Sequence, residues 1–223
     1  MEENKSFYSP IYSTYNEKGF APDLFFNALP NTLISLFIII SNSSLCYIII
    51  KYRLKYQTIK SNTSTLLFIY ASFEILNFTI RLIYFVRVSI GLNFLPMWLT
   101  KFYVIYINVS YMSIYFMYLL MSFDRLFAVS FPIIYKTLNK KLYIMGHLTT
   151  LIIFDISIFL IFIMPIFEYK NVLITGNPLD NIFFLSSINP IYSYITPIIF
   201  SITALIYLII AILTKYKTGI LKF

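Results

Sequence analysis

Apolar residues along the chain fall into five long blocks that are separated by short polar segments. A continuous apolar block of about 20 residues crosses the hydrocarbon core of a bilayer as an α-helix. The pattern therefore predicts an all-α protein built as a bundle of transmembrane helices. The expected spans are about 24–50, 64–86, 97–123, 142–167 and 188–213.

The segments outside these blocks give no sign of a second domain. Residues 24–215 form one predicted transmembrane bundle, and a polar tail of residues 1–23 precedes it. This tail lacks the basic head and short apolar stretch of a cleaved signal peptide, so we expect the first span to be an uncleaved anchor. Residues 216–223 are expected to be a cytoplasmic tail or the start of a further loop.

Basic residues are concentrated in alternate segments. The segments after the first, third and fifth spans hold eleven Lys or Arg against one acid, whereas the other segments are mixed. Because short cytoplasmic loops carry an excess of Lys and Arg, we expect the N-terminus outside and the C-terminus in the cytoplasm. The pattern predicts a multi-pass protein of the plasma membrane.

Composition narrows the class of protein further. The chain is 59% apolar and 12% charged, whereas soluble domains carry about a quarter charged residues. We assign the net charge of +8 to topology and to anionic lipid rather than to nucleic acid. One His and the single Cys46 leave no ligand cluster for a metal and no internal disulfide. We therefore expect no cofactor and no enzymatic activity.

Three polar residues inside the predicted spans are candidates for one intramembrane polar network: Asn42, Glu74 and Asp155. An acid inside hydrocarbon is costly, so Glu74 should face the bundle interior and find a partner or water. Asp155 either contacts a ligand or binds a proton, or it packs against Asn108, Ser110 or another hydroxyl of the third span.

Three arginines lie near the predicted ends of spans. Arg125 follows Asp124 directly at the end of the third span. Arg81 and Arg87, near the outer end of the second span, either meet an acidic ligand or extend to the interface, the reading we favour.

The segment "DRLFAVSFPIIY" resembles a motif of the rhodopsin-like G-protein-coupled receptors. It reproduces Asp124, Arg125, Pro132 and Tyr135 at the family's spacing, with Leu126 in place of the family's Tyr. Asn42 and Glu74 stand where the family has polar residues in its first and second spans. The Trp of the fourth span and the Cys of the third are missing. With these departures the chain looks like a nematode serpentine chemoreceptor of the class gamma or class V type.

The resemblance implies a seven-helix receptor fold, of which five spans are expected here, so the chain looks truncated after the fifth span and is not expected to signal alone. It implies a small-molecule ligand, whose binding residues it does not specify, and a heterotrimeric G protein as partner. Asp124 would hold Arg125 at rest, and Arg125 would contact the G protein on activation. Pro132 would end the helix extension, and Tyr135 would fix the following loop.

Two other functions stay open at this point. A transporter or half-transporter would place Glu74 and Asp155 on one ion path, although the chain shows no internal repeats. A membrane enzyme is the third possibility, and it lacks a His-containing cluster on which to act.

Overall fold

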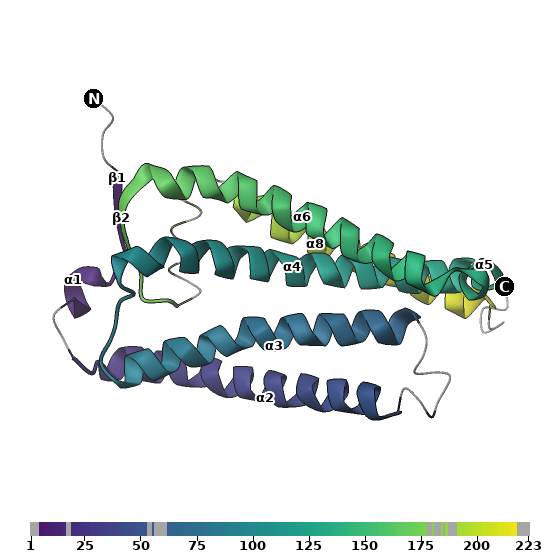
Figure 1. Ribbon diagram of the computed structural model, residues 1–223, viewed down its shortest axis with the longest axis horizontal. Coiled ribbons are helices and arrows are strands. Elements are labelled where there is room, and N and C mark those ends of the chain that lie inside the picture. Colours follow the sequence, from purple (N-terminus) through teal and green to yellow (C-terminus); the bar gives the residue numbers. More distant parts are fainter. Residues whose placement is uncertain are drawn as a thin grey trace.

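The computed structural model is dominated by five long helices that run side by side along the molecule (Figure 1). The structure describes residues 5–16, 19–52, 55, 62–177, 180, 184, 186 and 191–217.

The long helices match the predicted spans. All five are long and apolar enough to cross a membrane. The start of the fifth predicted span, residues 188–190, lies outside the described residues. The chain is a multi-pass, helical membrane protein. The helices are α2 (Pro22–Tyr52), α3 (Asn62–Ser89), α4 (Met97–Ser130), α6 (Lys140–Glu168) and α8 (Ile191–Lys217).

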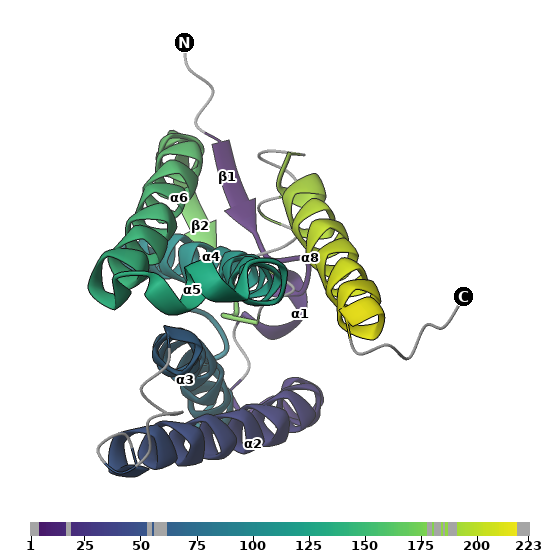
Figure 2. The ribbon, with the colours of Figure 1, turned by 90° about the vertical axis from the view of Figure 1, so that its right-hand side faces the viewer.

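Helix α4 is the centre of the bundle. It packs against α3, α6 and α8, and α2 packs against the far side of α3 (Figure 2). Successive helices run in opposite directions, so the start of α2 and the end of α8 lie at opposite ends of the molecule. The outward faces are apolar and exposed, as at Phe37 and Met164, which suits contact with lipid.

One end of the bundle carries a small parallel sheet and is called the strand end below. Strand β1 (Lys5–Tyr8) pairs with β2 (Tyr169–Leu173), and the short helix α1 (Tyr12–Tyr15) follows β1. The predicted all-α bundle is confirmed, and this small sheet of two short strands lies at its end, with β1 inside the segment that was expected to be a tail. The sheet forms because β1 and β2 emerge at the same end and Phe7 packs on Phe184, with ring centroids 4.8 Å apart.

A glycine permits the close approach of two links at the strand end. Gly91, between α3 and α4, has a φ of +80°, a conformation that costs glycine little. A Cβ at this position would lie 2.9 Å from backbone atoms of Gly19 and Phe20. The link between α3 and α4 can therefore pack directly against the segment that leads into α2.

The opposite end is called the Asp124 end. Helix α4 continues to Ser130, seven residues past the end of the predicted span at residue 123, so Asp124 and Arg125 lie in the expected helix extension. The short helix α5 (Pro132–Thr137) then starts, with Pro132 as its first residue, where a missing N–H costs nothing. Lys217 at the end of α8 donates to the carbonyl oxygens of Val129 and Ser130, which satisfies acceptors at the end of α4.

Candidate functional site

The carboxyl group of Asp124 is the best-connected polar group at the Asp124 end. Asp124 is 1% exposed. It accepts hydrogen bonds from Thr63 Oγ1 of α3 at 2.8 Å, from Tyr135 OH of α5 at 2.8 Å and from Tyr143 OH of α6 at 3.0 Å. These four residues, the Asp124 cluster, tie four helices together at one carboxylate.

Arg125 does not join the Asp124 cluster. Its side chain is exposed, and it forms no ion pair with Asp124 or with any other residue that the structure describes. Neighbouring residues of an α-helix point about 100° apart, so burying Asp124 turns Arg125 outward. The expectation that Asp124 holds Arg125 is therefore wrong for this state. Hydroxyl groups take the place of the guanidinium.

As predicted, Tyr135 fixes the segment after α4, and it does so through the hydrogen bonds of its hydroxyl group. Its hydroxyl donates to Asp124, and it also lies 3.1 Å from Thr63 Oγ1. Burial raises the pKa of Tyr135 above its ordinary value, and the hydrogen bond to Asp124 adds to the rise. The phenol therefore stays protonated and remains a donor at physiological pH.

Replacing Tyr135 by phenylalanine is expected to lower the free energy of unfolding by about 1 kcal/mol, because one charge-assisted hydrogen bond is lost. Thermal unfolding in detergent, followed by circular dichroism, measures the change. Tyr106→Phe is the matched control, because Tyr106 is exposed on α4 and forms no hydrogen bond within the described part of the chain. Equal melting temperatures for the two variants would contradict this role of Tyr135.

Glu74 is the centre of a second cluster, which lies inside the membrane-spanning region. Asn42 Nδ2 of α2 donates to Glu74 Oε2 at 2.5 Å, and Tyr118 OH of α4 donates to Oε1 at 3.1 Å. Tyr70 OH also donates to Oε1. The predicted inward orientation of Glu74 is confirmed, with 9% of its surface exposed, and Asn42 is its neighbour. Asn42, Tyr70, Glu74 and Tyr118 are called the Glu74 cluster below.

Asp155 is not part of the Glu74 cluster. Its Oδ1 accepts a hydrogen bond from Ser113 Oγ of α4 at 2.7 Å, so the expected hydroxyl on the third span is Ser113. Asn108 instead donates to the carbonyl of Val104, and Ser110 accepts from Asn77. The prediction of one polar network that includes Asp155 is wrong, because Glu74 and Asp155 face different sides of α4.

Two cavities flank α4, and each contains one of these acids. The Asp155 cavity, of about 420 Å³, is bounded by α3, α4 and α6, with Ser113, Phe102, Phe159 and Asp155 among its walls. The Arg81 cavity, of about 320 Å³, is bounded by α3, α4 and α8. Volumes of this size are those of small-molecule sites. The lining of the Arg81 cavity includes Glu74, Phe78, Arg81, Tyr111, Phe200 and Thr203.

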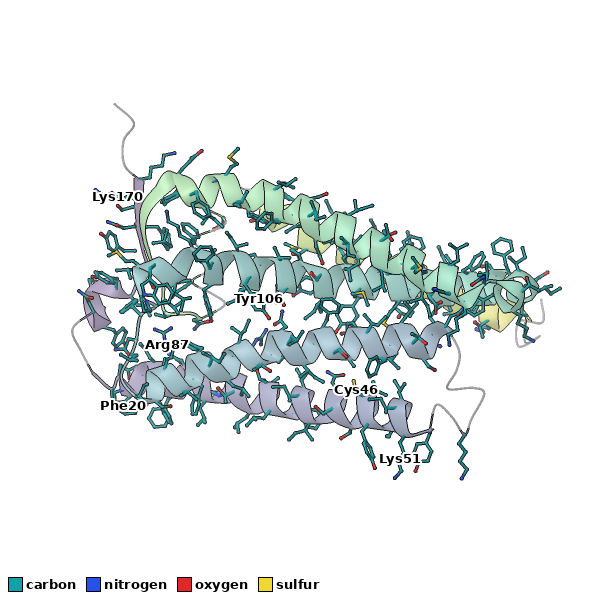
Figure 3. The ribbon with its side chains drawn as sticks, in the orientation of Figure 1. Phe20, Cys46, Lys51, Arg87, Tyr106 and Lys170 are labelled. Atoms are coloured by element: carbon teal, nitrogen blue, oxygen red, sulfur yellow. The ribbon has the colours of Figure 1, made fainter. Side chains whose placement is uncertain are left out.

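The two arginines of α3 differ in their surroundings. Arg87, at the strand end (Figure 3), donates to the carbonyl oxygens of Leu92 and Phe94 and so fastens the link that follows α3. Arg81 lies on the wall of the Arg81 cavity, and its guanidinium stands 4.5 Å from the ring centroid of Phe78. Both arginines were expected either to contact an acidic ligand or to extend to the interface. Arg87 extends toward the strand end of α3, whereas Arg81 turns into the bundle.

Several members of these clusters escaped the sequence reasoning. Thr63, Tyr70, Tyr118 and Tyr143 each give a hydroxyl to a buried acid. The spacing of Tyr70 to Glu74, one helical turn, is a signal that could have found that pair. The other three approach from different helices, and nothing local marks them.

The described residues contain no group of three or more His, Cys, Asp or Glu side chains that could hold a metal ion. Comparison with protein-family models and with curated proteins gave no match.

Proposed function

We propose that this membrane protein is a chemosensory receptor of the plasma membrane that acts through a heterotrimeric G protein. The strand end faces outward and admits a small molecule, and the Asp124 end faces the cytoplasm. Two things support the proposal: the geometry of the bundle and the rhodopsin-like pattern around Asp124 and Arg125. The form of that pattern resembles nematode serpentine receptors of class gamma or class V.

The observation that carries the proposal is the contrast between two neighbouring residues. Asp124 is buried and accepts three hydroxyl groups, whereas Arg125, the next residue, is exposed at the same end. A structural ion pair would need both side chains together. An exposed guanidinium on a rigid helix end is instead suited to binding the acidic or carbonyl groups of a partner protein.

The Asp124 cluster supplies an element that can exist in two states. Because one carboxylate holds α3, α4, α5 and α6, these helices cannot separate at this end unless its hydrogen bonds break. A ligand that binds better when the helices are rearranged shifts the equilibrium by its differential affinity. The end of α4 would then open to the G protein, with Arg125 already turned outward.

Transport is the weaker alternative. It needs Glu74 and Asp155 on one ion path, yet these acids line separate cavities on two sides of α4. The carboxylate of Glu74 also accepts hydrogen bonds from three donors, which fits a structural role. The geometry therefore supports the receptor better.

Binding of a G protein to the chain in lipid nanodiscs tests the proposal. Purified heterotrimeric G protein should be retained on immobilised nanodiscs that carry the chain and should pass over empty ones. Retention that does not exceed the empty nanodiscs, together with ion flux in vesicles that falls in Glu74→Gln and Asp155→Asn, would favour transport instead.

A further inference from the structure

Arg81 carries a positive charge into the membrane-spanning region, and none of the acids that the structure describes pairs with it. Its side chain is half-buried, and it forms no hydrogen bond or ion pair with the residues that the structure describes. Its guanidinium lies over the ring face of Phe78, 4.5 Å from the ring centroid. A guanidinium is costly to place in hydrocarbon, so an arginine there without an acidic partner is by default a candidate functional residue.

The direction of the side chain shows that Arg81 does not simply reach for the nearest interface. The strand end of α3 is the nearer end, and an arginine that reached for it would extend toward Arg87. Arg87 does so, and contacts carbonyl groups of the following link. Arg81 extends the other way, toward Phe78 three residues earlier. Its guanidinium is therefore directed into the bundle and along the Arg81 cavity.

Glu74 does not serve as the missing partner. It lies seven residues from Arg81 on α3, about 10 Å along the helix axis, and its oxygens accept from Asn42, Tyr70 and Tyr118. The Arg81 cavity thus has, on one wall, a cation that no described residue pairs with, and near its other end an acid that already accepts three hydrogen bonds.

We propose that the Arg81 cavity binds a small aromatic monocarboxylic acid, whose carboxylate pairs with Arg81. This inference deepens the proposed receptor function by naming the chemical class of its ligand, but the binding step itself involves no G protein.

The walls of the cavity favour this class over other anions. A planar carboxylate matches the two-pronged geometry of a guanidinium. Tyr111, Tyr115 and Phe200 form an aromatic wall, with ring centroids 4.8 Å apart for Tyr115 and Phe200, which suits an aryl group. A phosphate would bring a second negative charge that Arg81 alone does not balance and that Glu74 would repel.

Binding of 3-phenylpropanoate tests the inference, with 3-phenylpropan-1-ol and 3-phenylpropylamine as probes of equal skeleton. The full chain in phosphatidylcholine nanodiscs is titrated with each radiolabelled probe, and empty nanodiscs correct for partitioning. The acid is expected to bind at least about tenfold more tightly than the alcohol, because only the acid pairs with Arg81. The amine is expected to bind most weakly.

Variants assign the effect to Arg81. Arg81→Gln should reduce the acid-to-alcohol ratio to about one, whereas Lys101→Gln should leave it unchanged. Lys101 is a suitable control because its ammonium group lies against Phe167, outside the Arg81 cavity. If Arg81→Gln does not give folded protein, Arg81→Lys provides the test. Its acid-to-alcohol ratio should lie between one and the wild-type value, because lysine keeps the charge but not the planar guanidinium that binds a carboxylate with two hydrogen bonds.

An acid-to-alcohol ratio near one in the wild-type chain, or a wild-type ratio in Arg81→Gln or Arg81→Lys, would overturn the inference. G-protein retention separates this failure from that of the receptor proposal. Arg81→Gln should still retain the G protein, since Arg81 lies far from the Asp124 end, whereas loss of retention by the wild-type chain would count against the receptor proposal.

Discussion

Replacing Asp124 by alanine is expected to lower the free energy of unfolding of the bundle by about 3 kcal/mol. The substitution removes the common acceptor of Thr63, Tyr135 and Tyr143. Each interhelical hydrogen bond in a membrane protein contributes about 0.6–1.7 kcal/mol, and the three hydroxyl groups are left without their partner. Unfolding in mixed micelles by increasing fractions of a denaturing detergent gives the free energy directly.

Asp124→Asn separates the loss of hydrogen bonds from the loss of volume. Asparagine keeps one acceptor oxygen and nearly the same shape, so we expect this variant to lose only about 1 kcal/mol. A loss of under 1 kcal/mol in Asp124→Ala, or equal losses in both variants, would show that the carboxylate does not hold the helices together.

Replacing Arg125 by alanine is expected to reduce G-protein retention at least about 30-fold, the effect of removing a central arginine from a protein interface. The free energy of unfolding should change by no more than about 0.5 kcal/mol, because Arg125 is exposed and forms no bond within the described chain. Titration of the G protein onto nanodiscs and the detergent unfolding assay give the two quantities on the same preparation.

Lys136→Ala is the matched control for Arg125→Ala. Lys136 is also exposed and basic, and it lies on α5 at the same end. Its removal should weaken retention by less than about threefold, since rim charges affect mainly the rate of association. Equal effects of the two variants would mean that general positive charge, and not the guanidinium of Arg125, recruits the partner.

The membrane-spanning helices could be predicted from the sequence because their signal is local. Each apolar block is long enough to cross a bilayer as a helix, which satisfies its backbone hydrogen bonds within the segment. The inward orientation of Glu74 followed from the same physics, because a carboxylate in hydrocarbon must find donors.

Features that depend on contacts between distant segments could not be predicted in this way. The pairing of Lys5–Tyr8 with Tyr169–Leu173 joins segments that are far apart in the sequence, and neither has a strong strand pattern of its own. It arises because alternating helix directions bring both to one end of the bundle.

The surroundings of each charged residue also could not be predicted from the sequence. The adjacency of Asp124 and Arg125 suggested an ion pair, but adjacent residues of a helix point in different directions. Once the helix continues to Ser130, its rotation decides which of the two faces the bundle. Rotation likewise sends Asp155 to Ser113 and turns Arg81 into a cavity.

Chemical labelling of cysteine variants in cells tests the central claim, that the Asp124 end faces the cytoplasm, most directly. In a Cys46→Ser background, Ile133→Cys reports on the Asp124 end and Trp98→Cys on the strand end, since these side chains are 79% and 74% exposed. We predict that a membrane-impermeant maleimide labels Trp98→Cys in intact cells and labels Ile133→Cys only after permeabilisation. Labelling of Ile133→Cys in intact cells would contradict the account, because Arg125 would then face away from any cytoplasmic G protein.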